Sequence, residues 1–507
     1  MMEVLSNLGL GFQNALSLTN LMWVVIGSFL GTLVGMLPGV GPATGIAILI
    51  PVSYGMDPTT ALITMCAIYY GAMFGGSIAS IMINTPGDAS SIVTCFDGYR
   101  MAQNGRAGAA LATSAIASFI GGMIACVMVV LLAQLAASFA LKFGPAEMFA
   151  LILFAMTAAV TLAEGKLLRG LASLFAGLVV ASIGIDGQSG LVRFTMGLDV
   201  LQDGVDFLVA IIGAYALSEV FSSYAEMNVK HEIDTKRIGR VMITREDWNR
   251  IKTPIIRSTP VAFLLGCLPG IGGSMTSLIA YTTERQLAKN PEDFGKGDIV
   301  GVAAPEAANN ASATASIIPM LAIGIPSSGT TAVMLGALMM LGVQPGPMLF
   351  EMRPDVAWGV IASMFIGNIV LVFMNMPMVP YIAKLLALPQ RLLIPIIMCL
   401  AFMGTYMMNY SAFDFVLLVL FGLLGYSMQK LDVPIPPMVL GLILGSTLEK
   451  NFRMAMVEKS GSFSVFLDKP IALFFIALAA LSLAYSVWQT VKAAAREQER
   501  ANETPAA

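Results

Sequence analysis

Long apolar stretches, most of them long enough to cross a lipid bilayer, follow one another along almost the whole chain. A membrane-spanning helix needs about 20 consecutive apolar residues, because the hydrocarbon core is about 30 Å thick. The stretches occupy residues 21–37, 59–83, 107–141, 146–162, 167–185 and 207–224, and then 261–281, 300–325, 330–341, 356–386, 392–408, 413–428, 434–448 and 471–491. The stretch 107–141 fits one tilted helix or two shorter ones. We therefore predict an all-α polytopic membrane protein with about 12 transmembrane helices.

The composition agrees with this class and excludes others. Of the 507 residues, 57% are hydrophobic and 12% are charged, and the mean hydropathy is +0.80, whereas soluble domains carry about 25% charged residues. The formal charge is −3 and the basic residues lie in short loops, which argues against a nucleic-acid surface. The five cysteines form no C-x-x-C pair, so we interpret them as packing residues. The single histidine, His231, lies in the most charged loop, which leaves no histidine as a buried catalytic base.

The distribution of Lys and Arg predicts the orientation. Cytoplasmic loops are enriched in these residues, so we expect the basic segment 229–257 on the cytoplasmic side. The first basic residue is Arg100, so the N-terminal flank is expected outside, and no cleaved signal peptide is expected. The tail 492–507 is expected in the cytoplasm. The basic loop 449–469 then falls outside, against the same rule.

Two motifs occur twice in the same order. Gly-Met-Leu-Pro-Gly-Val-Gly at 35–41 returns as Gly-Cys-Leu-Pro-Gly-Ile-Gly at 266–272, and 83–91 matches 323–331 around a shared proline. Because the two halves are expected to begin on opposite sides, we interpret them as inverted-topology repeats, an architecture in which transporters bind substrate and ions near the midplane. The predicted parts are a first repeat at 1–228, a cytoplasmic basic loop at 229–257, a second repeat at 258–448, a loop at 449–469, an extra C-terminal transmembrane helix at 470–491 and a cytoplasmic tail at 492–507.

Proline and glycine inside the apolar motifs predict broken helices or hairpins. Proline removes a backbone donor and breaks the helix, so the freed backbone groups must face protein, water or a ligand. Close helix packing is the alternative for any single glycine, but four breaks at repeated positions favour a central cavity. The candidate substrate-binding residues are Gly39, Gly41, Pro42, Thr44, Thr85, Pro86, Gly87, Ser90, Gly270, Gly272, Gly273, Ser274, Pro326, Ser327, Ser328, Gly329 and Thr330.

Short polar side chains in the same motifs and in 303–314 suit a coupling ion. Hydroxyl, amide and freed carbonyl oxygens suit Na⁺, and helix N-termini suit a carboxylate. Glu306 is expected within the membrane, which favours a cation ligand or proton carrier, although an acid beside Pro305 also complements a helix N-terminus. Serine and threonine can instead bond to the carbonyl four residues earlier. The candidate ion-coupling residues are Asn84, Thr85, Asp88, Glu306, Asn309, Asn310, Ser312 and Ser328, with a candidate Na⁺ site at Asn84, Thr85, Asn309 and Ser328.

Four segments carry a resemblance to a known family. Leu-Pro-Gly-Val-Gly-Pro at 37–42, Asn-Thr-Pro-Gly-Asp at 84–88, Pro-Glu-Ala-Ala-Asn-Asn at 305–310 and Gly-Ile-Pro-Ser-Ser at 324–328 resemble the large membrane subunit of the tripartite tricarboxylate transporters. The resemblance implies a bacterial inner-membrane permease that works with a small membrane subunit and a periplasmic substrate-binding protein. It also implies import of citrate or another carboxylate with Na⁺ or H⁺ and no other cofactor. An elevator-type mechanism follows only from the similarity of this plan to the tripartite ATP-independent periplasmic transporters.

Other functions meet specific difficulties. A rhomboid-like protease requires a histidine near residues 327–329, and an intramembrane aspartyl protease requires a second motif to face Asp88. An ATP-driven importer would need nucleotide energy from another subunit, because the sequence contains no G-x-x-x-x-G-K-[ST] motif. A stand-alone carboxylate carrier, or a channel, working without a binding protein remains open as the alternative.

Overall fold

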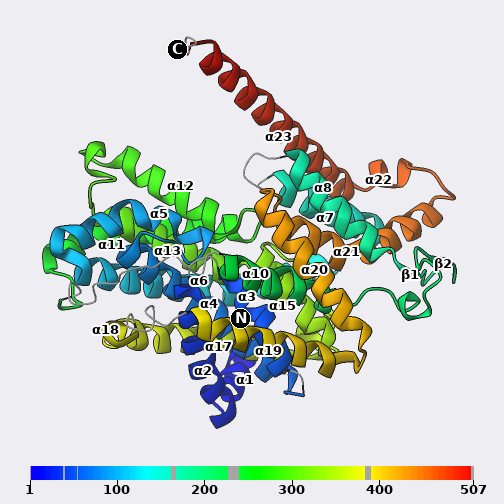
Figure 1. Cartoon of the computed structure of the whole chain (residues 1–507), viewed down its shortest axis with the longest axis horizontal. Coiled ribbons are helices and arrows are strands. Elements are labelled where there is room, and N and C mark those ends of the chain that lie inside the picture. The colour runs from blue at the N-terminus through cyan, green and yellow to red at the C-terminus, as the bar shows by residue number, and fades with distance from the viewer. Residues whose placement is uncertain are drawn as a thin grey trace. The chain divides into compact units, whose positions relative to one another are not determined.

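The computed structural model describes residues 2–37, 40–53, 55–161, 167–225, 239–382 and 390–503, and these residues are mostly helical (Figure 1). Seven described helices are long and apolar enough to cross a membrane: Leu18–Met36, Pro58–Ile83, Ala102–Ala140, Phe207–Ala225, Pro354–Asn375, Phe413–Lys430 and Pro470–Trp488. Shorter apolar helices lie at Pro42–Ser53, Pro145–Thr161, Leu167–Ala181, Gly329–Met340 and Ile394–Asn409. The helices agree with the predicted class, and the total of about 12 spans remains a prediction.

The chain divides into two compact units, the first formed by Met1–Leu141 and Leu208–Tyr426 and the second by Lys142–Phe207 and Ser427–Ala507. The first part of unit one contains α1 (Met2–Ala15), α2 (Leu18–Met36), α3 (Pro42–Ser53), α4 (Pro58–Ile83), η1 (Ala89–Ser91), α5 (Ile92–Thr94), η2 (Cys95–Tyr99), η3 (Ala102–Arg106) and α6 (Ala107–Ala140). Its second part contains η5 (Ile212–Leu217), α10 (Ser218–Ala225), α11 (Arg245–Gly266), α12 (Gly272–Leu287), η7 (Pro291–Asp293), α13 (Val300–Ala315), α14 (Ile317–Ala322), α15 (Gly329–Met340), α16 (Met348–Met352), α17 (Pro354–Asn375), α18 (Val379–Ile382) and α19 (Gln390–Asn409). Two helices, α9 (Phe207–Ile211) and α20 (Phe413–Lys430), continue from one unit into the other.

Polar side chains cap the start of α4 and α11 in unit one. Asp57 begins α4 by accepting a hydrogen bond from the backbone N–H of Thr59 at 3.0 Å. Thr244 and Asp247 form a capping box at the start of α11, in which each side chain accepts from the other residue's backbone N–H. Helix α11 therefore begins at Arg245, inside the segment 229–257 that the sequence predicts as a loop.

Small residues let α2 and α4 pack closely. A Cβ atom at Gly35 of α2 would lie 2.1 Å from the carbonyl oxygen of Ala72, and one at Gly75 of α4 would lie 2.1 Å from the carbonyl oxygen of Thr32. No side chain fits at either distance, so both positions require glycine. Gly35, the first residue of the repeated motif, thus has the packing role that the sequence left as an alternative.

Helix α13 lies in the interior of unit one. All residues from Gly301 to Ala315 are buried, and the helix packs against α6, α11 and α12. Gly121 of α6 allows this contact, because its Cβ would lie 2.5 Å from the carbonyl oxygen of Ala307. The most polar of the predicted spans is therefore also the most enclosed.

Some predicted spans differ from the helices observed. Residues 107–141, which fit one helix or two, form the single 34-residue helix α6, about 50 Å long at about 1.5 Å per residue. The predicted span 261–281 is divided between α11 and α12, and α17 ends at Asn375, well before the end of the predicted span 356–386. The first interruption contains Pro269 and Gly270, and Pro377 lies two residues after the end of α17, as expected from the backbone restrictions of these residues.

Unit two contains α7 (Pro145–Thr161), α8 (Leu167–Ala181), β1 (Gly184–Ile185), β2 (Val192–Arg193), η4 (Asp199–Leu201), α21 (Ile435–Glu458), α22 (Ser464–Asp468) and α23 (Pro470–Glu503). Strands β1 and β2 pair in the antiparallel sense. Helix α21 packs against α7 and α8, and α23 packs against α7. Gly177 of α8 is essential to this packing, because its Cβ would lie 2.0 Å from the carbonyl oxygen of Met438.

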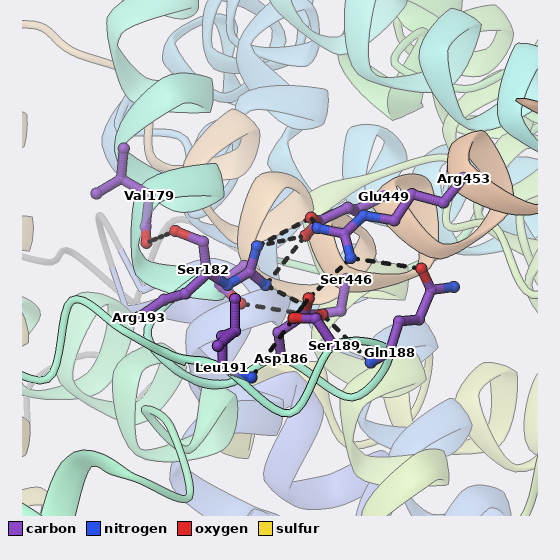
Figure 2. Close-up of polar contacts among 11 residues, drawn as sticks. Val179, Ser182, Asp186, Gln188, Ser189, Leu191, Arg193, Ser446, Glu449 and Arg453 are labelled. Carbon is purple, nitrogen blue, oxygen red and sulfur yellow. Dashed lines mark hydrogen bonds and ion pairs between the residues drawn. The ribbon is translucent and has the colours of Figure 1, made fainter. Parts of the chain in front are cut away.

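Ion pairs connect the β1–β2 hairpin to α21 (Figure 2). Arg193 donates to Glu449 Oε1 at 2.9 Å, and Arg453 Nη1 lies 2.7 Å from Asp186 Oδ2. Arg453 also donates to Glu449. Hydrogen bonds from Ser189 and Arg453 hold the pKa of Asp186 well below its ordinary value of 3.8. The hairpin is therefore attached to α21 by alternating charges.

The same region contains the basic loop 449–469 that conflicted with the predicted orientation. Helix α21 continues to Glu458, so the first part of that segment is helical. Lys459 pairs with Asp468 at 2.7 Å, and Lys469 pairs with Glu458 at 2.9 Å. These ion pairs hold the segment locally, but they do not remove its conflict with the predicted orientation, because the positive-inside rule counts Lys and Arg and acidic residues contribute little to it.

Candidate transport site

Glu306 lies in the middle of α13 and has no exposed surface. Ser77 of α4 donates to its Oε2 at 2.6 Å, and Ser118 of α6 donates to the same oxygen at 3.2 Å. Thr94 of α5 donates to Oε1, and Asn309 Nδ2 lies 3.5 Å from Oε2. No lysine or arginine pairs with this carboxyl group in the part of the chain that the structure describes. A carboxyl group from the second half is thus held by hydroxyl groups from the first.

The hydroxyl groups can accommodate either protonation state of Glu306. A carboxylate only accepts hydrogen bonds, whereas a protonated acid also donates one, and a hydroxyl can do either. Ser77 Oγ also lies 3.1 Å from the carbonyl oxygen of Met73. Its one hydrogen can turn to that carbonyl while its oxygen accepts from protonated Glu306. Because an unpaired buried charge is costly, the site is suited to a group that gains a proton or a cation.

The first-half loop 83–91 lies against α2. Asn84 ends α4 with a positive φ of 53°, and Asp88 begins η1 by accepting from the Ser90 backbone N–H at 3.0 Å and the Ser90 hydroxyl at 2.6 Å. A Cβ at Gly87 would lie 1.7 Å from the carbonyl oxygen of Gly35. The second motif of this half therefore packs on the first, at a point where only glycine fits.

The end of the first motif reaches the same loop. A Cβ at Gly41 would lie 3.1 Å from Asp88 Oδ1. Pro42 begins α3, and Thr44 is buried in its first turn. The predicted substrate-binding residue Gly39 lies outside the described residues.

The second-half loop 323–331 has the same local structure. Gly324 has a φ of 78°, and Ser328 begins α15 with a capping box to Thr331. The Gly270 backbone N–H donates to the carbonyl oxygen of Ser327 at 2.9 Å, so the two motifs of this half also touch. The repeat aligns Asn84 with Gly324 and Asp88 with Ser328, which means that positive φ and helix capping recur at matched positions.

Loops from the two halves meet beside α13. A Cβ at Gly273 would lie 2.9 Å from Ser90 Cβ and 3.9 Å from Asn309 Cβ. The backbone N–H of Gly270, three residues before Gly273, donates to the carbonyl oxygen of Ser327, which brings the loop with Ser328 to the same contact. The structure therefore brings the predicted residues Ser90, Gly273, Asn309 and Ser328 into one region.

Several buried oxygens in this region have no hydrogen-bond partner among the described residues. They are Asn310 Oδ1, Thr314 Oγ1 and Ser327 Oγ. The amide group of Asn310 donates to Asn309 Oδ1 at 2.6 Å and to the Glu306 carbonyl oxygen at 3.1 Å, so only its oxygen is unused. Buried polar atoms usually have partners, and such exceptions are frequent where water or an ion binds.

The four residues of the candidate Na⁺ site do not form one cluster through hydrogen bonds. Asn84 is exposed, and Thr85 donates to the carbonyl oxygen of Ile83 at 3.2 Å. Within the described residues, no hydrogen bond joins either of them to Asn309 or Ser328. The candidate Na⁺ site stays a prediction, and Asn309 is its member nearest to Glu306.

The other predicted residues line the loops or the packed interior. Ser312 is buried against α11, where a Cβ at Gly266 would lie 2.6 Å from Ser312 Cα. Of the rest, Pro86, Gly272, Ser274 and Gly329 are partly exposed, and Pro326 and Thr330 are buried.

Sequence reasoning missed the hydroxyl groups that hold Glu306. Ser77, Thr94 and Ser118 are isolated in apolar sequence, where a serine or threonine commonly bonds to its own helix. Only the packing of α4, α5 and α6 around α13 identifies them. A single sequence carries no signal for such distant contacts.

Comparison with known proteins identifies relatives along most of the chain. Residues 21–440 match the Tripartite tricarboxylate transporter TctA family. An Agrobacterium vitis protein described as "Uncharacterized 52.8 kDa protein in TAR-I ttuC' 3'region" is 42% identical over 478 residues, which cover 94% of this chain and 95% of the relative. A second protein of that organism, "Uncharacterized protein in TAR-II ttuC' 3'region", is 43% identical over 209 residues, 41% of this chain and 86% of the relative. No solved structure gives a significant match.

Proposed function

This chain belongs to the tripartite tricarboxylate transporter TctA family, and we propose that it imports a tricarboxylate or another organic carboxylate across the bacterial inner membrane. Membership implies the large subunit of a tripartite transporter, together with a small membrane subunit and a periplasmic binding protein. It also places the chain among transporters and not among enzymes. Citrate is one candidate substrate, and an ion gradient is the proposed energy source.

The observation that carries the proposal is the buried Glu306 and its hydroxyl partners. Secondary transport requires a group that binds the coupling ion in the membrane, and intramembrane carboxyl groups commonly serve this purpose. Glu306 has no counter-charge among the described residues. We assign it to coupling, through a proton or through Na⁺.

The substrate is proposed to bind where the two repeated loops meet. Asp88 lies at the tip of the first loop, beside Gly41 and Ser90. A carboxylate substrate can approach this acid only if a cation or a proton offsets the repulsion. Such an arrangement makes substrate binding depend on the ion, which is the requirement for symport. An elevator movement of the site across the membrane belongs to the same proposal.

Uptake of labelled citrate into proteoliposomes tests this function. The full chain is reconstituted with both partner subunits, and Na⁺ and pH gradients are imposed separately. Glu306→Gln should remove the pH dependence of a proton-coupled carrier, because the amide cannot titrate. In a Na⁺-coupled carrier the same variant should keep the pH profile and need at least tenfold more Na⁺ for half-maximal uptake.

Glu147→Gln is the matched control, because Glu147 is also buried but lies in unit two, where it accepts from the Gly144 backbone N–H at 3.0 Å. Its ion dependence should equal that of the unchanged protein. Wild-type responses to both gradients in Glu306→Gln would remove Glu306 from coupling. Uptake that needs no binding protein would favour the stand-alone carrier, and flux without gradient coupling would favour a channel.

A further inference from the structure

A second region, separate from Glu306, is a cavity of about 660 Å³ in unit one, which is lined by apolar and aromatic side chains together with a few polar ones. Its walls include Asn84 and Pro86 from the loop that follows α4, Arg100 after η2, and Arg285 near the end of α12. The side chains of Arg100 and Arg285 are exposed. The cavity thus joins one of the repeated loops to two guanidinium groups that come from different halves of the sequence.

Neither arginine is neutralised. Arg100 donates to Gln103 Oε1 at 3.0 Å, and Arg285 donates from Nε to the carbonyl oxygen of Pro291 at 3.3 Å. Neither forms an ion pair with any residue that the structure describes. A guanidinium group has five donor hydrogens, so each arginine retains most of its donors for a ligand.

Two acidic groups behind the cavity wall, Asp97 and Asp298, are already engaged. Asp97 is completely buried, and it accepts from the backbone N–H groups of Gly297 and Asp298, each at 2.8 Å, and from the Tyr281 hydroxyl at 2.9 Å. Asp298 also pairs with Arg250 at 2.6 Å. Among the described residues that line the cavity, the charged ones are Arg100 and Arg285, so the charge of the lining is positive.

The Asp97 contacts also fix the cavity wall. They join η2, which precedes Arg100, to the loop that follows Arg285. Gly295 and Gly297 have φ angles of 83° and 107°, which allow several backbone N–H groups to converge on one carboxylate. The two arginines are therefore attached to segments that are held together.

Two ion pairs connect the segments around this cavity to the basic segment 229–257, which is expected in the cytoplasm. Arg106 pairs with Asp247 at 2.6 Å, and Arg250 pairs with Asp298 at the same distance. Asp247 and Arg250 lie in the first turns of α11, within the described part of segment 229–257. The positive-inside rule then gives the cavity a cytoplasmic opening.

We propose that the cavity with Arg100 and Arg285 is a carboxylate-binding vestibule. The transported anion passes through it from the loop at Asn84 and Pro86 to the cytoplasm. Two guanidinium groups suit a molecule with two or three carboxylates, because each can bind one carboxylate with paired hydrogen bonds. The role of the vestibule in transport rests on the proposed function. Its ligand chemistry is testable without transport.

Direct binding of citrate to the purified, detergent-solubilised chain is the first test. Calorimetry at low and high salt should show weak, salt-sensitive binding. The double variant Arg100→Gln/Arg285→Gln should weaken it at least tenfold, and Arg100→Lys/Arg285→Lys should restore part of it. Arg169→Gln, a change in unit two at an exposed pair with Asp432, should bind citrate like the unchanged protein.

Acetate and inorganic phosphate identify the ligand class. Citrate should bind at least tenfold more tightly than acetate, and phosphate should not compete at equal concentration. Equal binding of citrate and phosphate would mean a general anion patch. Unchanged citrate binding in the folded double variant would also overturn the proposal. These outcomes are independent of uptake, so loss of vestibule binding and failure of the transport assay are distinguishable.

The side of the membrane is tested with Arg100→Cys in a background that lacks the five native cysteines. A membrane-impermeant thiol reagent should label this cysteine in inside-out vesicles, and citrate should slow the labelling. Labelling only in right-side-out vesicles would place the opening on the other side and overturn the exit role.

Discussion

Glu306 is surrounded by hydroxyl groups and not by an opposite charge. An opposite charge would fix the carboxyl group in its ionised form, whereas hydroxyl groups exchange donor and acceptor roles as a proton comes and goes. Substitutions that remove these hydroxyl groups should therefore change the ion dependence of uptake more than they change the stability of the fold.

Ser77→Ala should shift the ion concentration for half-maximal uptake by tenfold or more. The variant removes a 2.6 Å hydrogen bond to Glu306, and a hydrogen bond to a charged group is worth about 1.5–3 kcal/mol. Ser77→Thr keeps a hydroxyl group and should restore most of the response. Uptake in proteoliposomes at varied Na⁺ and pH measures both variants.

Thr64→Ala is the control on the same helix. The Thr64 hydroxyl donates to the carbonyl oxygen of Thr60 at 2.7 Å and makes no contact with Glu306. Its ion dependence should not change. An equal shift in Thr64→Ala and Ser77→Ala would mean that general loosening of α4, and not the bond to Glu306, controls the response.

At this scale the sequence predicts the acid but not its surroundings. Glu306 and Asn309 stand out because polar side chains are rare in an apolar span. Ser77 and Ser118 do not stand out, because serine is common in membrane helices and their role comes from contact with α13. Arg100 and Arg285 fall outside the repeated motifs, so motif analysis passed over the cavity between them.

At the level of the elements, the first-half loop 83–91 packs on α2 through a contact that leaves no room for a side chain. Gly87→Ala should destabilise the protein by about 1–3 kcal/mol or more, because the new Cβ would lie 1.7 Å from the Gly35 carbonyl oxygen and the backbone would have to move. Thermal unfolding in detergent should show a lower Tm. Gly9→Ala in α1, where a Cβ meets nothing within 4 Å, should not lower it.

The hairpin of unit two provides a prediction about pH. The pKa of Asp186 is lowered in the folded protein, so its contribution to stability is present above its ordinary pKa of 3.8 and is lost only as the pH falls through the lower folded value. The Tm difference between the unchanged protein and Asp186→Asn should thus be constant from about pH 8 to about pH 5. A difference that disappears by about pH 6 would show that Arg453 and Ser189 do not lower this pKa in solution.

The element order was partly predictable. Glycine and proline marked where α2 and α11 end, because backbone restrictions act locally. The start of α11 at Arg245 was missed, because its first turns are charged and hydropathy locates only apolar segments. The sequence also allowed residues 107–141 to be one helix or two. Gly121 serves close contact with α13, and Gly122 serves close contact with Asn368 of α17, so neither glycine marks a break.

For the whole molecule, the orientation can be tested independently of the transport site. Cysteines placed at Ser6 and Lys236, in a background without native cysteines, should react with an impermeant reagent from opposite sides of the membrane, because the flank before Arg100 lacks basic residues and the segment 229–257 is rich in them. Lys236 lies outside the described residues, and its substitution reports only its side. Labelling of both positions from one side would contradict the inverted repeat.

The partners of Glu306 impose an order on synthesis. Ser77, Thr94 and Ser118 enter the membrane long before the ribosome reaches Glu306, because they precede it by 229, 212 and 188 residues. Until then these hydroxyl groups cannot bond to the carboxyl group of Glu306. Insertion of α13 therefore comes after that of α4 and α6, and a nascent chain released before residue 300 has α4 and α6 but lacks the carboxyl group that their serine hydroxyl groups contact.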